Sequence, residues 1–463
     1  MPDRPVTLPL LLRRALAAAV IVALALPAPA MAQQAGPSIL RDAETEAMFR
    51  EMSAPLIRAA GLSPVNVKVV LVNDPEINAF VAGGQIVYVH SGLIQAASSA
   101  NQVQGVIAHE LGHVTDGHIA NADAGAKPAM GIYLLSLALG IAAMAAGSGE
   151  AGAGILAAGQ QAAMGRYLAF SRTQEATADA SAVKYLNTAG VTGKGMLSFF
   201  KVLQQQEYRF GVENIDPFMQ SHPLSGERIA TMSADIQKSL AYNKAPDPGL
   251  EEQFRRVKAK LEGYAYPPAR TFADYPESDN SLYAHYARAY AYHKGGYPDK
   301  ADAEVAALVK AKPDDPYFQE IKGQILLEAG KPREALGPLR YAFEHTDSNA
   351  LIGTTLGHAL IATEDKANYP EATKVLRLAV ARDDENPFAW YQLGTVYELT
   401  GDQPRAMLAS AERASMNGDS RTAAATARYA MAGLPQNTSD WIRAQDIAMT
   451  AQNDLDANKK KRR

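Results

Sequence analysis

The stretch Val106-Ile107-Ala108-His109-Glu110-Leu111-Gly112-His113 decides how the first half of this chain is organised. On an α-helix of about 3.6 residues per turn, His109 and His113 lie one above the other, so both imidazoles can bind one metal ion. Glu110 projects about 100° round the helix from His109, where it can act on a water beside that metal. This spacing is typical of zinc peptidases, although an amphipathic helix can contain it by chance. Upstream, Ser99-x-x-Gln102 predicts a capped helix start.

Length and composition narrow the class of protein. The chain has 463 residues, more than one hydrophobic core usually supports, so two or three domains are expected. Its formal net charge is −4. The sequence contains no basic stripe interleaved with aromatic residues, so nucleic acid is not an expected partner. The chain has no cysteine, so disulfides are excluded and any metal ligand must be His, Asp or Glu.

Residues 1–32 have the pattern of a secretory signal. Basic residues precede an apolar run from Ala15 to Leu26, and Ala30-Met31-Ala32 matches a cleavage site. We therefore expect an exported protein whose mature chain begins near Gln33. An uncleaved membrane anchor is the alternative, but the run is short for a membrane span and is followed by Pro27.

A helix is expected over Arg41 to Ala60, followed by two β-type runs. The runs Val65 to Val72 and Gln85 to Val89 predict a small sheet beside the motif helix. The edge of such a sheet can hold a substrate backbone in extended form, because its free N–H and C=O groups accept one more strand. Alternatively, the sheet only covers the core.

Residues 128–165 form an unusually apolar segment, with Glu150 as their single charge. Three interpretations remain open. The segment could be a transmembrane span, a buried core hairpin, or a mobile apolar lid over the active site that touches membrane or unfolded substrate.

Two carboxylates follow on the next predicted helix, at Glu175 and Asp179. They are four residues apart and share a helix face. Because cysteine is absent, Glu175 is the predicted third metal ligand, and Asp179 is placed to accept the free ring N–H of a ligand histidine. An ordinary solvated acidic face is the alternative. His118 falls about 140° off the ligand face of an ideal helix, so we expect it at the surface or behind the ligands.

A loop histidine, His222, precedes a helix that contains Arg228. His222 could donate to the oxyanion of a tetrahedral intermediate, occupy the open zinc position in a resting state, or cap a neighbouring element. Arg228 is a candidate cationic donor to the same intermediate.

Together, these motifs resemble the gluzincin peptidases of the HtpX, Oma-type and CAAX prenyl protease family, and in particular an exported branch of it that carries tetratricopeptide repeats. The resemblance covers about residues 43–234 and rests on His109-Glu110-x-x-His113, Glu175-x-x-x-Asp179, His222-Pro223-x4-Arg228, Asn78-Ala79-Phe80, Gly83-Gly84 and Ser91-Gly92-Leu93. It implies one Zn²⁺ held by His109, His113 and Glu175, with Glu110 as general base. It also implies a periplasmic location and a role in outer-membrane protein assembly and quality control.

The second half contains an internal repeat. Gly323, Gly330 and Ala335 recur as Gly394, Gly401 and Ala406, and Gly357 lies one 34-residue repeat beyond Gly323. This period predicts a tetratricopeptide solenoid, whose concave face suits a peptide or partner protein. A final helix over Ser439 to Leu455 would cap it, and the basic end Lys459 to Arg463 is expected to be a disordered tail that solubilises the chain or touches anionic lipid.

The sequence thus predicts a mainly α protein, with a zincin-type metallopeptidase domain carrying a small β-sheet and then an α-solenoid. The expected division is a signal peptide at 1–32, a peptidase domain at 33–262 with the insert 128–165, a linker at 263–280, repeats at 281–435, and a capping helix and basic tail at 436–463. The predicted function is zinc-dependent cleavage of misfolded or stalled envelope proteins, with the repeats recruiting substrate or the outer-membrane assembly machinery. The alternative is a repeat-based chaperone or assembly factor whose protease site is mostly held inactive.

Overall fold

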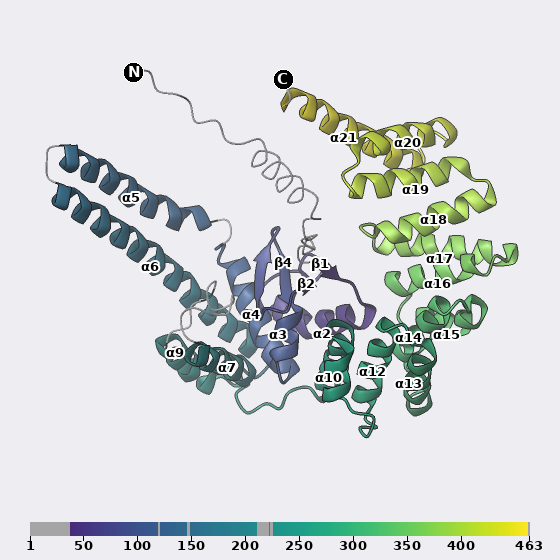
Figure 1. The fold of residues 1–463 in the computed structure, drawn as a ribbon, viewed down its shortest axis with the longest axis horizontal. Coiled ribbons are helices and arrows are strands. Elements are labelled where there is room, and N and C mark those ends of the chain that lie inside the picture. The colour runs from purple at the N-terminus through teal and green to yellow at the C-terminus, as the bar shows by residue number, and fades with distance from the viewer. Residues whose placement is uncertain (1–37, 119–120, 146–148, 211–221, 223–225, 462–463) are drawn as a thin grey trace, which may run out of the picture. The chain divides into compact units, whose positions relative to one another are not determined.

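The computed structural model describes residues 38–118, 121–145, 149–210, 222 and 226–461 (Figure 1). Across these residues the protein is mainly helical, with one small sheet near its start, which confirms the predicted fold class. The predicted signal peptide, residues 1–32, and most of the loop around His222 lie outside the described residues.

The sheet consists of β1 (Ser38–Leu40), β2 (Lys68–Asn73), β3 (Ala79–Ala82) and β4 (Ile86–His90), in the order β1-β2-β4-β3. Strands β2 and β4 are parallel, and β3 pairs antiparallel with β4 through a tight turn. Gly83 and Gly84 form that turn with φ of 60° and 95°, a left-handed conformation that glycine adopts without strain. The sequence predicted β2 and β4 but missed β3, which contacts the motif helix from the end of the sheet.

The motif lies on α4 (Ala100–Thr115), which is buried along nearly its whole length. The surrounding helices are α2 (Ala43–Ala59), α3 (Ser91–Ala96), α6 (Gly149–Ala189), α7 (Lys194–Phe210), α9 (Gly226–Lys238) and α10 (Pro248–Ala265). Two glycines allow the closest contacts. A Cβ atom on Gly105 would lie 2.4 Å from Met196 Cβ of α7, and one on Gly112 would lie 2.8 Å from the Ala178 carbonyl oxygen of α6.

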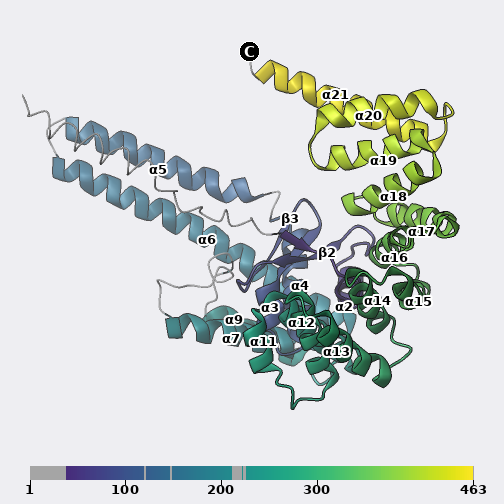
Figure 2. The same ribbon diagram turned by 45° about the vertical axis from the view of Figure 1, so that its right-hand side comes forward.

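Helix α5 (Ala122–Ala145) runs side by side with the first half of α6 as a long hairpin (Figures 1 and 2). Of the three interpretations of residues 128–165, the buried core hairpin is wrong, because large apolar side chains such as Leu135 (62% exposed) and Met130 (55% exposed) face outward. Among the helices that the structure describes, none is long and apolar enough to cross a membrane.

The second half is a stack of antiparallel helices. After α11 (Pro268–Asp274) it contains α12 (Leu282–Lys294), α13 (Pro298–Ala311), α14 (Pro316–Glu328), α15 (Pro332–Glu344), α16 (Ala350–Ala362), the short 3₁₀ helix η2 (Lys366–Asn368), α17 (Tyr369–Arg382), α18 (Pro387–Thr400), α19 (Gln403–Met416), α20 (Ser420–Gly433) and α21 (Ser439–Lys461).

The repeating glycines explain this stack. A Cβ on Gly323 or on Gly357 would lie 2.4 Å from the Cγ of a leucine on the next helix, Leu339 or Leu376. The pairs α14/α15 and α16/α17 therefore need glycine where their two helices cross.

Two ends of the repeat region differ from the sequence expectation. The proposed linker, residues 263–280, includes α11, and Thr271 within it is fully buried. Helix α21 continues to Lys461, beyond the expected end at Leu455, so the first residues of the predicted basic tail are helical. Lysines at a helix C-terminus interact favourably with the helix dipole, which accounts for the extension.

Candidate metal centre

Helix α4 presents the two histidines of the motif on its buried face. The helix starts as predicted, since the Ser99 side chain accepts the Gln102 N–H and Gln102 Oε1 accepts the Ser98 N–H at 2.7 Å. His109 is fully buried, His113 is 9% exposed, and their Nε2 atoms are 3.1 Å apart. One turn of helix therefore brings both ring nitrogens to one point.

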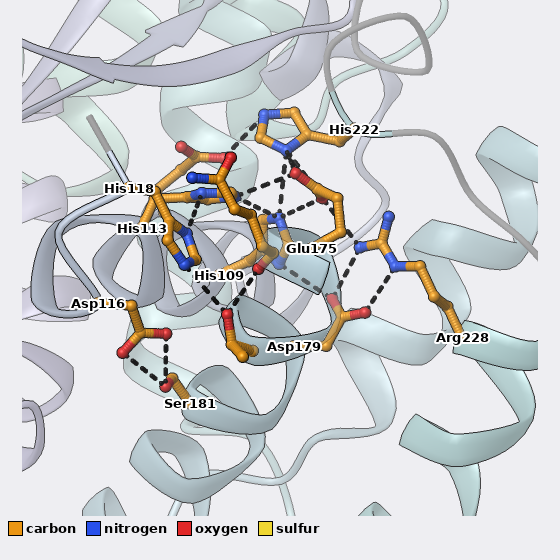
Figure 3. A network of polar contacts seen from close by, with 12 residues as sticks. His109, His113, Asp116, His118, Glu175, Asp179, Ser181, His222 and Arg228 are labelled. Atoms are coloured by element: carbon orange, nitrogen blue, oxygen red, sulfur yellow. Dashed lines mark hydrogen bonds and ion pairs between the residues drawn. The ribbon is translucent and has the colours of Figure 1, made fainter. Parts of the chain in front are cut away.

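Helix α6 crosses α4 at Gly112 and brings a carboxylate to the same point. Glu175 Oε2 lies 3.3 Å from His109 Nε2, and Glu175 Oε1 lies 3.5 Å from His113 Nε2 (Figure 3). With His222, these residues offer four ligand atoms that all lie within 4.8 Å of one another. The structure thus brings the three predicted zinc ligands together from two helices.

Asp179 stands one turn beyond Glu175 on α6, behind the His109 ring. Its Oδ1 atom is 3.0 Å from His109 Nδ1, so the ligand histidine that the sequence left unspecified is His109. Arg228 of α9 holds this carboxylate by donating from Nε to Oδ2 at 2.7 Å and from Nη2 to Oδ1 at 2.9 Å, and Nη2 also lies 3.1 Å from Glu175 Oε2. This geometry favours a positioning role for Arg228 over the expected donation to an oxyanion.

The chain after α4 places a further histidine behind His113. Gly117 has a φ of 67°, so the chain leaves the helix and returns, and His118 Nδ1 comes within 2.9 Å of His113 Nδ1. Thr177 Oγ1 on α6 lies 3.0 Å from His118 Nε2 and donates to the Gln174 carbonyl. Sequence reasoning missed Thr177, because only the crossing of α6 over the end of α4 brings it there.

Arg228 reaches Glu175 from α9, whereas His222 reaches the ligands from the loop before that helix. Its Nδ1 atom lies 3.1 Å from Glu175 Oε2 and 3.3 Å from His109 Nε2, and its Nε2 lies 3.6 Å from Glu110 Oε1. Of the three roles expected for His222, this position favours the zinc-ligand role, because a capping residue or an oxyanion donor need not touch the other ligands.

The charges of the centre are strongly coupled. Burial opposes charge on every group, but the Asp179 and Glu175 carboxylates overcome it and raise the pKa of His109 to about 10. Burial and the neighbouring His109 charge lower the pKa of His113 to about 2. Burial is likewise overcome at Glu175, where His109 and His222 hold the pKa of the carboxyl below its ordinary value. At Glu110 burial dominates and raises the pKa.

This donor set fits a divalent metal. When Asp179 accepts the Nδ1–H of His109 and His118 accepts that of His113, both Nε2 lone pairs face each other and the Glu175 carboxylate. Lone pairs that converge in a buried site need a cation between them, and the raised pKa of His109 indicates that the site attracts positive charge. Two imidazoles and a carboxylate suit zinc and leave a position for water.

A helical fold with a histidine pair, a carboxylate from a second helix and a buried glutamate beside them defines this protein as a metallopeptidase. Residues 40–236 match peptidase family M48, which confirms the family resemblance predicted from the motifs.

Known proteins of this kind include bacterial and mitochondrial relatives. The chain is 27% identical over 391 residues to the beta-barrel assembly-enhancing protease of Escherichia coli O157:H7, covering 78% of this chain and 71% of that protein. It is 34% identical to the metalloprotease LoiP of Escherichia coli K12 over 37% of this chain and 64% of LoiP. It is also 25% identical to the mitochondrial metalloendopeptidase OMA1 of Bos taurus, over 41% of this chain and 38% of OMA1.

Proposed function

We propose that this protein is an exported, zinc-dependent endopeptidase that cleaves misfolded or stalled envelope proteins and acts in the assembly and quality control of outer-membrane β-barrels. The observation that carries the proposal is the buried group of His109, His113 and Glu175 with Glu110 beside it. The similarity to a beta-barrel assembly-enhancing protease supports the choice of substrate class.

In this proposal His109, His113 and Glu175 hold one zinc ion. When bound, zinc would supply Lewis acidity toward water and toward the scissile carbonyl. Asp179 fixes the His109 ring by accepting from Nδ1, and Arg228 fixes Asp179 through two hydrogen bonds. These contacts keep the ligand atoms in place while substrate enters and leaves.

Glu110 acts as the general base. Its side chain is 1% exposed, and its raised pKa suits a carboxylate that takes a proton from the attacking water and returns it to the leaving amine. Among the carboxylates that the structure describes close to His109 and His113, Glu175 and Asp179 already contact the two histidines, so of these Glu110 is left to perform this proton transfer.

The substrate would lie along β3, the last strand in the described order of the sheet. Because β3 pairs only with β4 in that order and contacts α4, an extended peptide could add to its outer edge and pass the centre. A requirement for extended chain would select unfolded proteins over folded ones.

We further propose the domain plan stated from sequence, with the peptidase domain at residues 33–262 and repeats at 281–435 that recruit substrate or the outer-membrane assembly machinery. The proposed location is the periplasm, reached through the signal at residues 1–32. The helix pairs α12 to α20 support a solenoid that binds extended partners on its concave face.

The position of His222 favours a second candidate function. Because His222 Nδ1 lies among the ligand atoms, it can take the position that water or substrate needs. In that state the protein would act as a repeat-based chaperone or assembly factor, and proteolysis would begin only after His222 leaves the ligand position.

The first test replaces the proposed base. We expect Glu110→Gln to lower cleavage of an unfolded protein such as casein by at least about a thousandfold while zinc content stays at one ion per chain. Activity would be followed by gel and zinc by elemental analysis. Wild-type cleavage by the Glu110→Gln protein would refute the proposal.

The second test addresses the resting state. If His222 occupies the open ligand position, His222→Ala should increase self-cleavage and casein cleavage. If His222 instead donates to the oxyanion, the same variant should lose about two to three orders of magnitude in kcat. The sign of the change distinguishes the two roles.

A further inference from the structure

The α5/α6 hairpin exposes an apolar face that the peptidase function does not use. On α5 the exposed side chains are Met130 (55%), Tyr133 (42%), Leu134 (53%), Leu135 (62%), Leu139 (53%) and Ile141 (54%). The side of α5 that packs on α6 carries small residues where the helices meet: Gly140 faces Leu156, and Ser136 faces Gly159. The large residues therefore point away from the hairpin rather than into it.

Charge on the hairpin is confined to its two ends. Residues 128–149 and 151–165 carry no charged side chain. At the base of the hairpin, the first charged residues on the two helices are Lys127 and Arg166, both basic and exposed. The register set by Gly140 and Gly159 places them within about one helical turn, ~5 Å, of each other along the axis.

The two faces of the hairpin differ in polarity. The outer face of α6 consists largely of alanine and glycine and includes exposed Gln160, Gln161 and one large apolar residue, Met164 (56%), whereas the outer face of α5 is leucine-rich. Tyr133 and Tyr167, both exposed, lie toward the basic end. An apolar face, tyrosines and basic residues at one boundary together match the layers of a phospholipid surface.

An extended polypeptide is a poorer match. The surface of two helices offers no free backbone N–H or C=O groups for an extended chain, because each helix satisfies its own. Lipid needs no such groups, and the basic pair Lys127 and Arg166 complements anionic headgroups.

We propose that the α5/α6 hairpin docks on an anionic phospholipid surface, with the exposed face of α5 among the acyl chains of one leaflet and Lys127 and Arg166 at the headgroup phosphates. This inference does not depend on the proposed peptidase function. It does place the proposed cleavage near the lipid surface, because α6 continues without a break from the hairpin to the metal centre. Glu175 lies nine residues beyond Arg166, about 14 Å along the helix, so cleavage would take place beside the membrane.

The absence of cysteine allows a direct test. Leu134→Cys and Ile141→Cys, two exposed positions seven residues apart on one side of α5, would each be labelled with an environment-sensitive fluorophore, and vesicles of phosphatidylethanolamine and phosphatidylglycerol would be added to the full chain. We expect a blue shift and a several-fold rise in emission at both positions. Leu240→Cys, at a leucine 98% exposed outside the hairpin, and Gln161→Cys on the α6 face are matched controls that should not respond.

A second variant checks the consequence. Leu134→Glu/Ile141→Glu should reduce co-flotation with these vesicles by at least about tenfold, while casein cleavage without vesicles stays at the wild-type rate; Leu240→Glu should change neither. Labels at Leu134 and Ile141 that stay silent with vesicles would overturn the proposal. A blue shift that instead follows protein concentration without lipid would also overturn it, because a second copy would then cover this face.

Discussion

His109 is held from both sides of its ring, and this arrangement determines the chemistry of the centre. Its Nε2 atom faces His113 and Glu175, while its Nδ1 faces Asp179 at 3.0 Å. Arg228 then orients Asp179 with two short hydrogen bonds. A residue that never touches the metal can therefore control how well the metal is bound.

Asp179→Asn tests whether Asp179 sets the affinity of the centre for zinc. The amide keeps the size of the side chain but loses the charge that accepts from His109 and pairs with Arg228, so zinc affinity should fall about 10–100-fold. Zinc affinity would be measured by competition with a chromophoric chelator. The matched control is Asp116→Asn, since Asp116 also bonds to α6, through Ser181 Oγ at 3.1 Å, but contacts none of the predicted ligands. Equal zinc affinity in the two variants would contradict the role given to Asp179.

At the level of elements, the crossing of α4 and α6 creates the site. Neither helix alone carries three ligands, and the distance between them is set at Gly112, whose absent side chain lets the Ala178 backbone approach. The same principle repeats in the solenoid, where Gly323 and Gly357 allow α14 and α16 to pack closely on α15 and α17. Small residues at crossings thus allow close packing at the candidate metal centre in one half and in the stack of repeats in the other.

We expect Gly112→Ala to destabilise the protein by about 1–3 kcal/mol, because the new Cβ would meet backbone atoms that cannot rotate away. Zinc affinity should fall with it, as the two ligand-bearing helices are forced apart. Gly337→Ala in α15 is the control, since a Cβ there meets nothing within 4 Å and alanine favours helix by roughly 0.5–1 kcal/mol. Urea unfolding of the two metal-free variants would measure their free energies of unfolding. Similar losses of unfolding free energy in Gly112→Ala and Gly337→Ala would contradict the prediction.

For the whole molecule, a buried ionic network joins the start of the peptidase region to the first repeats. Lys260 of α10 lies 2.5 Å from Asp42 and 3.5 Å from Glu44, at the start of α2. Arg256 bridges Glu44 at 2.8 Å and Asp315 of α14 at 2.6 Å. These paired charges are buried and come from distant parts of the sequence. They therefore couple the packing of α2 to that of the first repeats.

Asp42→Asn should weaken this connection in a pH-dependent way. Asparagine still caps α2, but the charge facing Lys260 is lost. We expect the free energy of unfolding to fall by about 1.5–3 kcal/mol near pH 7. Burial raises the pKa of the Asp42 carboxyl, yet Lys260 overcomes this and lowers it below its ordinary 3.8. The stabilisation is therefore present above about pH 4 and is lost as the pH falls through the folded pKa.

Urea unfolding at about pH 7 and about pH 3 would measure this, with the difference from wild type shrinking at the lower pH. Asp456→Asn, at an exposed residue 3.7 Å from Lys459, should cost less than about 0.5 kcal/mol at either pH. A loss for Asp42→Asn that is as small as that control would show that the network does not stabilise the fold.

The sequence by itself determined what depends on regular local spacing. Helical periodicity placed His109 with His113 and Glu175 with Asp179, and the 34-residue period predicted the solenoid, because residues at fixed intervals on a helix share a face whatever surrounds them. The fold class follows from these patterns and is confirmed. The metal-binding and catalytic roles remain predictions.

Only the tertiary structure decided which distant groups meet. His118 reaches His113 because the chain turns back at Gly117, and Arg228 engages Asp179 because α9 packs against α6. The outward face of α5 is likewise a tertiary fact, since an apolar segment looks the same in sequence whether a core covers it or not. Such contacts depend on how whole elements pack, and packing is set by the combined surfaces of many residues rather than by any one spacing.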